Sequence, residues 1–134
     1  MKKLMIMLSL ILALTHIGYT QQTDTLIISN ITGTVYNAVP SQCNDDHLHT
    51  ADGSFINKDE IGNLNWIAIS RDLEEKGLKM GDVIEIYHED EDICGVYEVH
   101  DRMNPRWTNK IDFLVPDSVK YGKWNNITIT KRGF

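Results

Sequence analysis

The chain has 134 residues, of which 13 are basic and 19 acidic, and its net charge at pH 7 is −6. This balance argues against nucleic-acid binding, in which Lys and Arg must neutralise phosphates, and against general binding to anionic membranes. The length is enough for one modest core and not for two. We therefore expect a single small domain that binds no nucleic acid.

The first twenty residues have the layout of a signal peptide. Lys2 and Lys3 precede the apolar run LMIMLSLILAL, and the segment ends with Gly18, Tyr19 and Thr20. The run is shorter than the roughly 20 apolar residues of a membrane span. We predict cleavage near Thr20, export to the periplasm or the extracellular space, and no stable membrane insertion afterwards. The mature chain then has 11 basic and 19 acidic residues, a net charge of −8.

Short β-strands separated by polar loops are expected in the rest of the chain, because β-branched and aromatic residues recur in short runs. The predicted organisation is a signal peptide over 1–20, a leader with the start of a strand over 21–33, and a barrel domain over 34–132. The predicted strands are 26–39 with a break near Gly33, then 66–70, 83–87, 93–101, 110–115 and 126–132, and the predicted helical turns are 71–76 and 116–121.

Six or seven short strands with only two helical turns predict an all-β fold, a small closed barrel. The segment from Pro40 to Lys58 predicts a long polar loop, and loops of this length in a small domain are usually functional or disordered. It contains His47 and His49, which together with Asp45, Asp46 or His100 are metal-ligand types. No motif spacing supports a metal site there. We therefore predict no metal and no cofactor.

The segment from Tyr97 to Pro116, YEVHDRMNPRWTNKIDFLVP, is the strongest candidate for a functional site. Asp101 ends one predicted strand and Asp112 lies in the next, and the loop between them is too polar to be core. Two carboxylates that face cations and amides can perform acid–base chemistry. The alternative is that both acids stabilise the loop by binding its cations and amides. The loop carries Arg102, Asn104, Arg106, Trp107, Asn109 and Lys110, and Trp107 is placed either to stack on a sugar or to cover the barrel mouth.

The order of these segments resembles the double-psi β-barrels of bacterial cell-wall metabolism. Within that group the chain is similar to the three-Asp domain, shared with membrane-bound lytic transglycosylase A, and to the rare lipoprotein A domain. LKMGDVIEI resembles the family's Leu-Gly-Thr turn into a strand, and TADG resembles its Thr-Ala-x-Gly turn. The most specific feature is the spacing of Asp101 and Asp112. The similarity covers Thr34 to about Lys131 and implies a six-stranded double-psi β-barrel.

The resemblance also implies a function, cleavage of peptidoglycan glycan strands by a lytic-transglycosylase-like mechanism. Asp112 matches the proposed catalytic acid of the family, and Asp101 matches its supporting carboxylate. Ser70 departs from the pattern, because the related domains have Asp or His there, and Met103 and Asn104 replace glycines after the first Asp. The residues expected to line the substrate groove are Ser70, Arg102, Asn104 and Trp107.

Two other functions are compatible with such a barrel. One is a non-catalytic module that binds a glycan or a protein, including an inhibitor-like module, and the serine at position 70 favours it. The other is a hydrolase of a different polysaccharide, since barrels of this shape also occur in endoglucanases and expansins. We expect a monomer whose partner is peptidoglycan or another polysaccharide.

Two cysteines, Cys43 and Cys94, remain after export to an oxidising compartment in which a disulfide persists. They form no CxxC pair, so thiol-redox and Cys-zinc functions are not favoured. We predict a disulfide between them, which would stabilise the fold by closing a long loop. The alternative is two buried free thiols.

Overall fold

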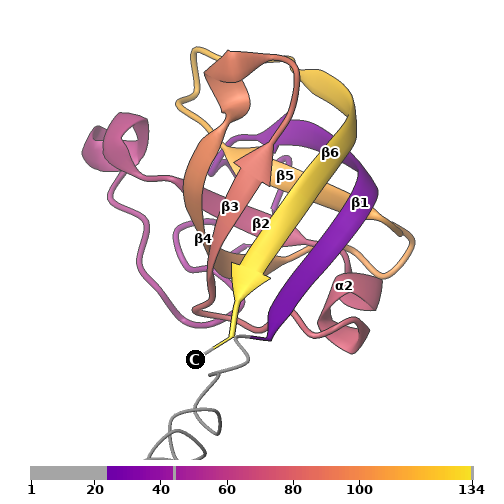
Figure 1. Ribbon diagram of the computed structural model, residues 1–134. Helices are drawn as coiled ribbons and strands as arrows, with labels where there is room; N and C mark the ends of the chain where they lie inside the picture. The colour runs from indigo at the N-terminus through magenta and orange to yellow at the C-terminus, as the bar shows by residue number, and fades with distance from the viewer. Residues whose placement is uncertain (1–23, 44, 134) are drawn as a thin grey trace, which may run out of the picture.

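Six strands close into a barrel in the computed structural model, which describes residues 24–43 and 45–133 (Figure 1). Around the barrel the strands follow the order β1-β5-β2-β4-β3-β6. The predicted all-β class and small closed barrel are confirmed, whereas the predicted signal peptide lies outside the described residues. The strands are β1 (Thr25–Tyr36), β2 (Trp66–Ile69), β3 (Val83–Tyr87), β4 (Gly95–Arg102), β5 (Lys110–Leu114) and β6 (Lys123–Arg132).

Strand β1 pairs antiparallel with β6 and parallel with β5. It begins at Thr25, inside the segment expected to be a leader with the start of a strand. Its register with β6 shifts on both sides of Ile31, and Asn30 has a φ of 60°. Asparagine tolerates this left-handed conformation better than most residues do. The break expected near Gly33 is therefore a pair of register shifts within one continuous strand.

Two apolar clusters hold the barrel together. Ile67 and Ile69 of β2 are fully buried in the first cluster, which fills the barrel interior. Ala68, between them, points to the other side and belongs to the second cluster, on the outside of the wall. Both faces of β2 are buried, so its sequence is apolar throughout rather than alternating. The second cluster consists of Tyr36, Ala38, Ile56, Ile61, Ala68, Met103 and Leu114.

The helical segments are short. The turn expected over 71–76 is present as α2 (Arg71–Glu75), and the chain leaves it through Gly77, whose φ of 117° favours glycine. The helical turn expected over 116–121 is not a helix. The Val119 amide donates a hydrogen bond to the Pro116 carbonyl oxygen, which forms a single turn of the backbone. Two 3₁₀ turns lie in polar segments, η1 (Lys58–Asn63) and η2 (Glu91–Ile93).

Each 3₁₀ turn begins with a capping side chain that the sequence supplies. Asn57 accepts a hydrogen bond from the Asp59 amide, and Asp90 accepts one from the Asp92 amide.

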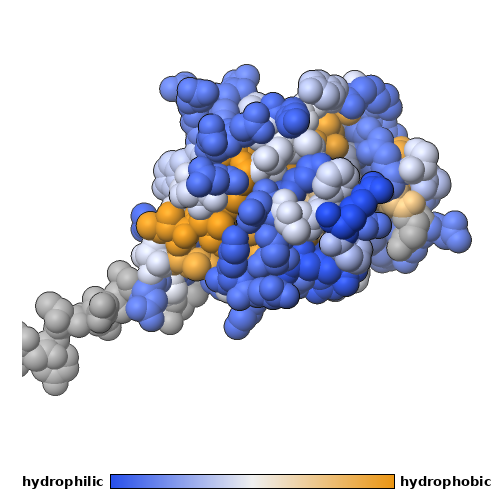
Figure 2. Space-filling view, turned by 90° about the vertical axis from the view of Figure 1, so that its right-hand side faces the viewer, coloured by the Kyte–Doolittle hydropathy of each residue, from blue (hydrophilic) through white to orange (hydrophobic). Residues whose placement is uncertain are grey.

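Across the described residues no helix has the length and apolar character needed to cross a membrane. The face in Figure 2 is largely hydrophilic, with a hydrophobic area on one side of that view.

Candidate functional site

Four neighbouring strands bring a row of side chains to the outer wall of the barrel. Asp112 on β5 lies opposite Thr34 on β1 and, on its other side, opposite Ala68 on β2. Ala68 in turn lies opposite Asp101 on β4. The two aspartates are two strand spacings apart, so their α-carbons are separated by about 10 Å. The small side chain of Ala68 leaves a hollow between the two carboxylates.

A bulge in β4 turns Asp101 toward this row. Ile67 pairs with Val99 and the next residue, Ala68, pairs with Asp101, so His100 is an extra residue in the ladder. Strict alternation would instead point Asp101 to the same side as Val99, which is fully buried inside the barrel. Bulges occur next to active sites because they re-aim a side chain in this way.

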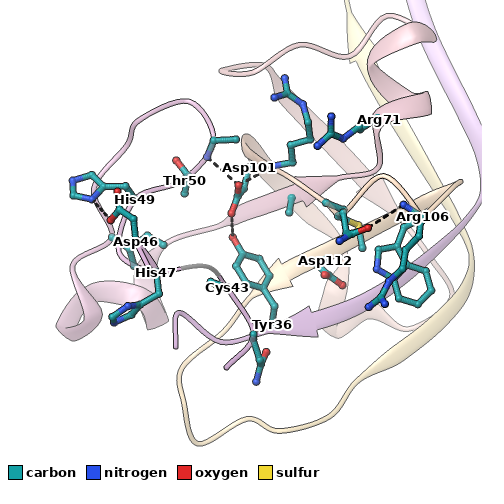
Figure 3. A pocket seen from close by; sticks show the side chains of 18 residues that line it. Tyr36, Cys43, Asp46, His47, His49, Thr50, Arg71, Asp101, Arg106 and Asp112 are labelled. Atoms are coloured by element: carbon teal, nitrogen blue, oxygen red, sulfur yellow. Dashed lines mark hydrogen bonds and ion pairs between the residues drawn. The ribbon is translucent and has the colours of Figure 1, made fainter. Parts of the chain in front are cut away.

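The row lies in an open cleft of about 670 Å³. Figure 3 shows Asp101 and Asp112 in the middle of this cleft, with Asp46, His47 and His49 on one side and Arg71 and Arg106 on the other. The site is therefore on the outer wall of the barrel and not at its mouth. Of the residues predicted for the site, the cleft is lined by Asp101, Arg102, Asn104, Trp107 and Asp112.

Asp112 is a half-buried acid with few partners. The Thr34 hydroxyl donates a hydrogen bond to its Oδ1, and the strand register fixes this pair. Burial raises the pKa of Asp112, while the Thr34 hydrogen bond and the charge of Lys110 lower it only in part. The carboxyl therefore holds its proton to a higher pH than an exposed aspartate does, in a place that a ligand can reach.

Asp101 has a different environment, because it joins three parts of the site. Its Oδ1 accepts hydrogen bonds from the amides of Ala51 and Arg102, each at 2.9 Å, and its Oδ2 accepts one from the Tyr36 hydroxyl at 3.3 Å. Burial raises the pKa of Asp101, and the three hydrogen bonds lower it by less. The negative charge of Asp52 raises the pKa further. Burial and the Asp101 carboxylate also raise the pKa of the Tyr36 hydroxyl. Asp101 thus anchors the loop around Ala51 to the barrel wall.

Ser70 does not line the groove, so the prediction for this residue is wrong. Its side chain is fully buried, and its Oγ accepts a hydrogen bond from the Lys110 amide at 3.0 Å. The residue is also the N-cap of α2, and its backbone amide donates to the Lys110 carbonyl at 2.9 Å. Ser70 therefore joins the start of α2 to β5, and its buried side chain does not face the cleft.

One end of the cleft is basic and aromatic. Arg102 forms a bidentate ion pair with Glu74, at 2.6 Å from Nε and 2.5 Å from Nη2. The Lys110 ammonium lies 3.7 Å from the ring centre of Trp107, and the Arg106 guanidinium lies 4.8 Å from it. These cation–π contacts hold the Trp107 ring, which is 38% exposed.

The other end of the cleft is formed by the loop that contains His47 and His49. The His49 ring binds Asp46 at 2.7 Å. Behind the loop, His100 binds Asp52 through Nδ1 at 2.6 Å and Glu98 through Nε2 at 2.7 Å. Both ring nitrogens of His100 are occupied, so this residue fastens the loop to β4. In the chain from 24 to 43 and from 45 to 133, no group of three or more His, Cys, Asp or Glu side chains could hold a metal ion.

The predicted disulfide is absent, since Cys43 and Cys94 are both free thiols. Cys43 lines the cleft and its Sγ lies 3.6 Å from the Asn37 carbonyl oxygen. Cys94 follows η2, is exposed, and contacts the His88 carbonyl oxygen at 3.1 Å. Burial raises the pKa of the Cys43 thiol, which makes it a poor nucleophile.

Thr34 and Tyr36 belong to the candidate site, and the sequence prediction missed them. They lie on the same side of β1, two positions apart, and contact Asp112 and Asp101 respectively. Their spacing in TVY is the only local signal, and it predicts a shared strand face without naming the partner. Ala51 and Arg71 were missed for a similar reason, because their neighbours are remote in sequence.

No protein-family model and no curated protein matches this chain. Among solved structures, the fold is similar to that of the Streptomyces papain inhibitor, with a TM-score of 0.50 and 19% sequence identity. The similar region covers 81% of this chain and 94% of the inhibitor chain. A likeness at this identity concerns the barrel fold alone.

Proposed function

We propose that this chain is an exported enzyme of the lytic-transglycosylase type, which cleaves peptidoglycan glycan strands with Asp112 as its single acid/base. The observation that carries the proposal is the environment of Asp112. Its carboxyl is half-buried, burial raises its pKa, and it lies on the wall of an open cleft. Such a group keeps a proton that it can donate to a leaving oxygen.

In the proposed reaction, protonated Asp112 gives its proton to the glycosidic oxygen as the bond to the muramyl anomeric carbon breaks. The resulting carboxylate then takes the proton of the muramyl 6-hydroxyl, whose oxygen attacks the anomeric carbon and forms a 1,6-anhydro ring. The proton balance on Asp112 is restored, and no water is consumed. A second carboxylate to activate water, as in ordinary glycosidases, is not required.

The other residues of the row have supporting roles in this proposal. Thr34 fixes the carboxyl of Asp112 by its hydrogen bond, and Ala68 leaves room for a sugar between the two aspartates. Asp101 holds the loop at Ala51 that forms one wall of the cleft. Asn104 and Trp107 line the opposite end, where the ring edge and exposed part of Trp107 can contact a sugar.

The resemblance of the sequence to the three-Asp and rare lipoprotein A domains supports the same function. Asp101 and Asp112 are the residues that match the family pattern, and the proposed fold is their double-psi β-barrel. The layout of residues 1–20 supports export, which would bring the protein to the cell wall.

The test is digestion of purified, insoluble peptidoglycan, followed by mass spectrometry of the soluble products. The proposal predicts 1,6-anhydromuramyl ends in products released by the wild-type protein and their loss in an Asp112→Asn variant purified in the same way, which controls for contaminating enzymes. Products that carry only reducing ends would indicate hydrolysis and contradict the proposed reaction.

A second candidate function is a non-catalytic module that binds a glycan or a protein. The observation that favours it is Ser70, because a buried serine stands where the related domains have an acid or a histidine. The Streptomyces papain inhibitor is by its name a protein-binding molecule, but its 19% identity gives this candidate no further weight. Retained binding to the insoluble wall without any released product would favour the binding module.

A further inference from the structure

Lys110 and Asp112 lie on the same side of β5, two positions apart. Ile111, between them, and Phe113, after them, point into the barrel and are buried there. Lys110 and Asp112 therefore both point outward, with their α-carbons about 7 Å apart. A lysine side chain spans this distance, so the Lys110 ammonium is able to reach the carboxyl of Asp112.

The Lys110 ammonium is bound to an aromatic ring instead. It lies 3.7 Å from the ring centre of Trp107, which is a cation–π contact. Among the residues that the structure describes, Lys110 forms no salt bridge with Asp112 or with another carboxylate. The ring of Trp107 thus holds the only other charged side chain of β5 at a place where it does not pair with Asp112.

The turn before β5 fixes the ring in this place. Asn109, which precedes Lys110, has a φ of 48°, a left-handed conformation that asparagine tolerates. Its amide donates a hydrogen bond to Asp72 Oδ2 at 2.9 Å, and its carbonyl oxygen accepts one from the Thr32 amide at 3.0 Å. These bonds to α2 and β1 hold the turn that brings Trp107 over Lys110.

We propose that Trp107 is a positioning residue, whose ring holds the Lys110 ammonium away from Asp112 and so favours the protonated form of that carboxyl. An ammonium in contact with the carboxyl would favour the ionised form and remove the proton that the reaction donates. While Asp112 is protonated, no ion pair competes with the ring for the ammonium, so the two states support each other. The consequence for catalysis rests on the proposed function, whereas the position of Lys110 does not.

The other titratable groups around Asp112 leave Lys110 as the charge to test. Tyr36 on β1 and Cys43 after it face the carboxyl, and both are uncharged because burial raises the pKa of each. Burial also raises the pKa of Asp112, and the charge of Lys110 lowers it even from its place at the ring. A closer approach of Lys110 would lower it further. The same cleft is also lined by Asp101 on β4, Arg71 on α2 and the loop residues Arg102 and Arg106.

The test is an NMR titration of the Asp112 carboxyl carbon in the full mature protein, without substrate. In Trp107→Leu the ammonium is released, and the ratio of protonated to ionised Asp112 at a given pH should fall at least about tenfold, the effect of an opposite charge at contact distance. Trp107→Phe retains a ring and should resemble the wild type. Lys110→Met added to Trp107→Leu should restore the ratio, because no ammonium remains to pair with Asp112. The dispersion of the same spectra shows whether each variant is folded.

Arg106→Gln is the matched control. It removes a cation that lies 4.8 Å from the centre of the same ring but is not on β5, so the titration of Asp112 should stay near that of the wild type. Lys110→Met alone should move the midpoint of Asp112 to higher pH, because the charge of Lys110 lowers the pKa of Asp112. The fall in release of 1,6-anhydromuramyl products with rising pH should move in the same direction.

A fall in Trp107→Leu that persists after Lys110→Met is added would assign the change to contact of Asp112 with water and overturn the proposal. An unchanged titration in Trp107→Leu would show that the released Lys110 turns to solvent, and would overturn it as well. An effect of Arg106→Gln as large as that of Lys110→Met would reduce the result to general charge. Because the titrations need no substrate, absence of products from peptidoglycan would contradict the proposed function and leave the position of Lys110 standing.

Discussion

Replacement of Asp101 separates an anchoring role from a catalytic one. In Asp101→Asn, the amide oxygen can still accept from the Ala51 and Arg102 amides, and the new NH₂ group can donate to the Tyr36 hydroxyl oxygen. All three hydrogen bonds of the wild-type carboxylate therefore have an uncharged equivalent. Because burial already raises the pKa of Asp101, removal of its charge should change the free energy of unfolding by less than about 1 kcal/mol.

Asp101→Ala removes every acceptor at this position. The Tyr36 hydroxyl, on a buried side chain, and two backbone amides then lose their partner, although the exposed amide at Ala51 can turn to water. We expect a loss of about 1–3 kcal/mol, which lowers the melting temperature by about 5–15 °C for a domain of this size.

The assay is thermal unfolding followed by circular dichroism, together with glycan turnover at a temperature at which both variants are folded. The anchoring role predicts that Asp101→Asn resembles the wild type in both measurements. Equal destabilisation by Asn and Ala would refute the hydrogen-bond assignment. A roughly 10²-fold loss of turnover in a fully stable Asp101→Asn variant would show instead that Asp101 transfers a proton.

Three further predictions concern the surroundings of the row. Ala68→Leu should fill the hollow between the aspartates and weaken glycan binding at least tenfold, as measured by wall sedimentation, whereas Ala68→Gly should not. Ser70→Asp should destabilise the fold by about 1–3 kcal/mol without a gain in turnover, because the side chain is buried against the Lys110 amide; increased turnover would contradict its burial. Burial lowers the pKa of His100, but its hydrogen bonds to Glu98 and Asp52 raise it overall, so the contribution of protonated His100 should be present below about pH 6.5 and be lost as pH rises through the raised value. Urea midpoints at pH 6 and pH 9 should show this fall, and the same fall in His100→Gln would assign it to another group.

The polar loop between β4 and β5 drew attention to the two aspartates of the candidate site from sequence alone. Asp101 lies near the end of β4 and Asp112 in the middle of β5, on either side of a loop too polar to be core. Their roles were not visible, because the hydrogen bonds of Asp101 come from Tyr36 and Ala51, which are remote in sequence. The bulge at His100, which decides the direction of Asp101, also has no local signal.

Ser70 shows why a polar residue at a strand end is ambiguous. A serine there can face a groove or can turn inward and bind the backbone of a neighbouring strand, and the two cases differ in the direction of the chain after it. The segment after Ser70 folds back as α2, and the Ser70 side chain binds the Lys110 amide.

The disulfide predicted between Cys43 and Cys94 was wrong, because both cysteines are free. The prediction used the oxidising compartment and the even number of cysteines. Neither of these gives the distance between the two residues, which decides whether a disulfide can form.

We propose Asp112 as the acid/base of the cleft, and the turnover of Asp112→Asn is the decisive measurement. The Asn side chain retains an oxygen that can accept from the Thr34 hydroxyl but has no proton of suitable acidity to transfer. We expect the release of 1,6-anhydromuramyl products to fall by roughly 10² or more, while the melting temperature stays within a few degrees of the wild type. Unchanged turnover, or a loss of turnover that only follows a lowered melting temperature, would contradict it.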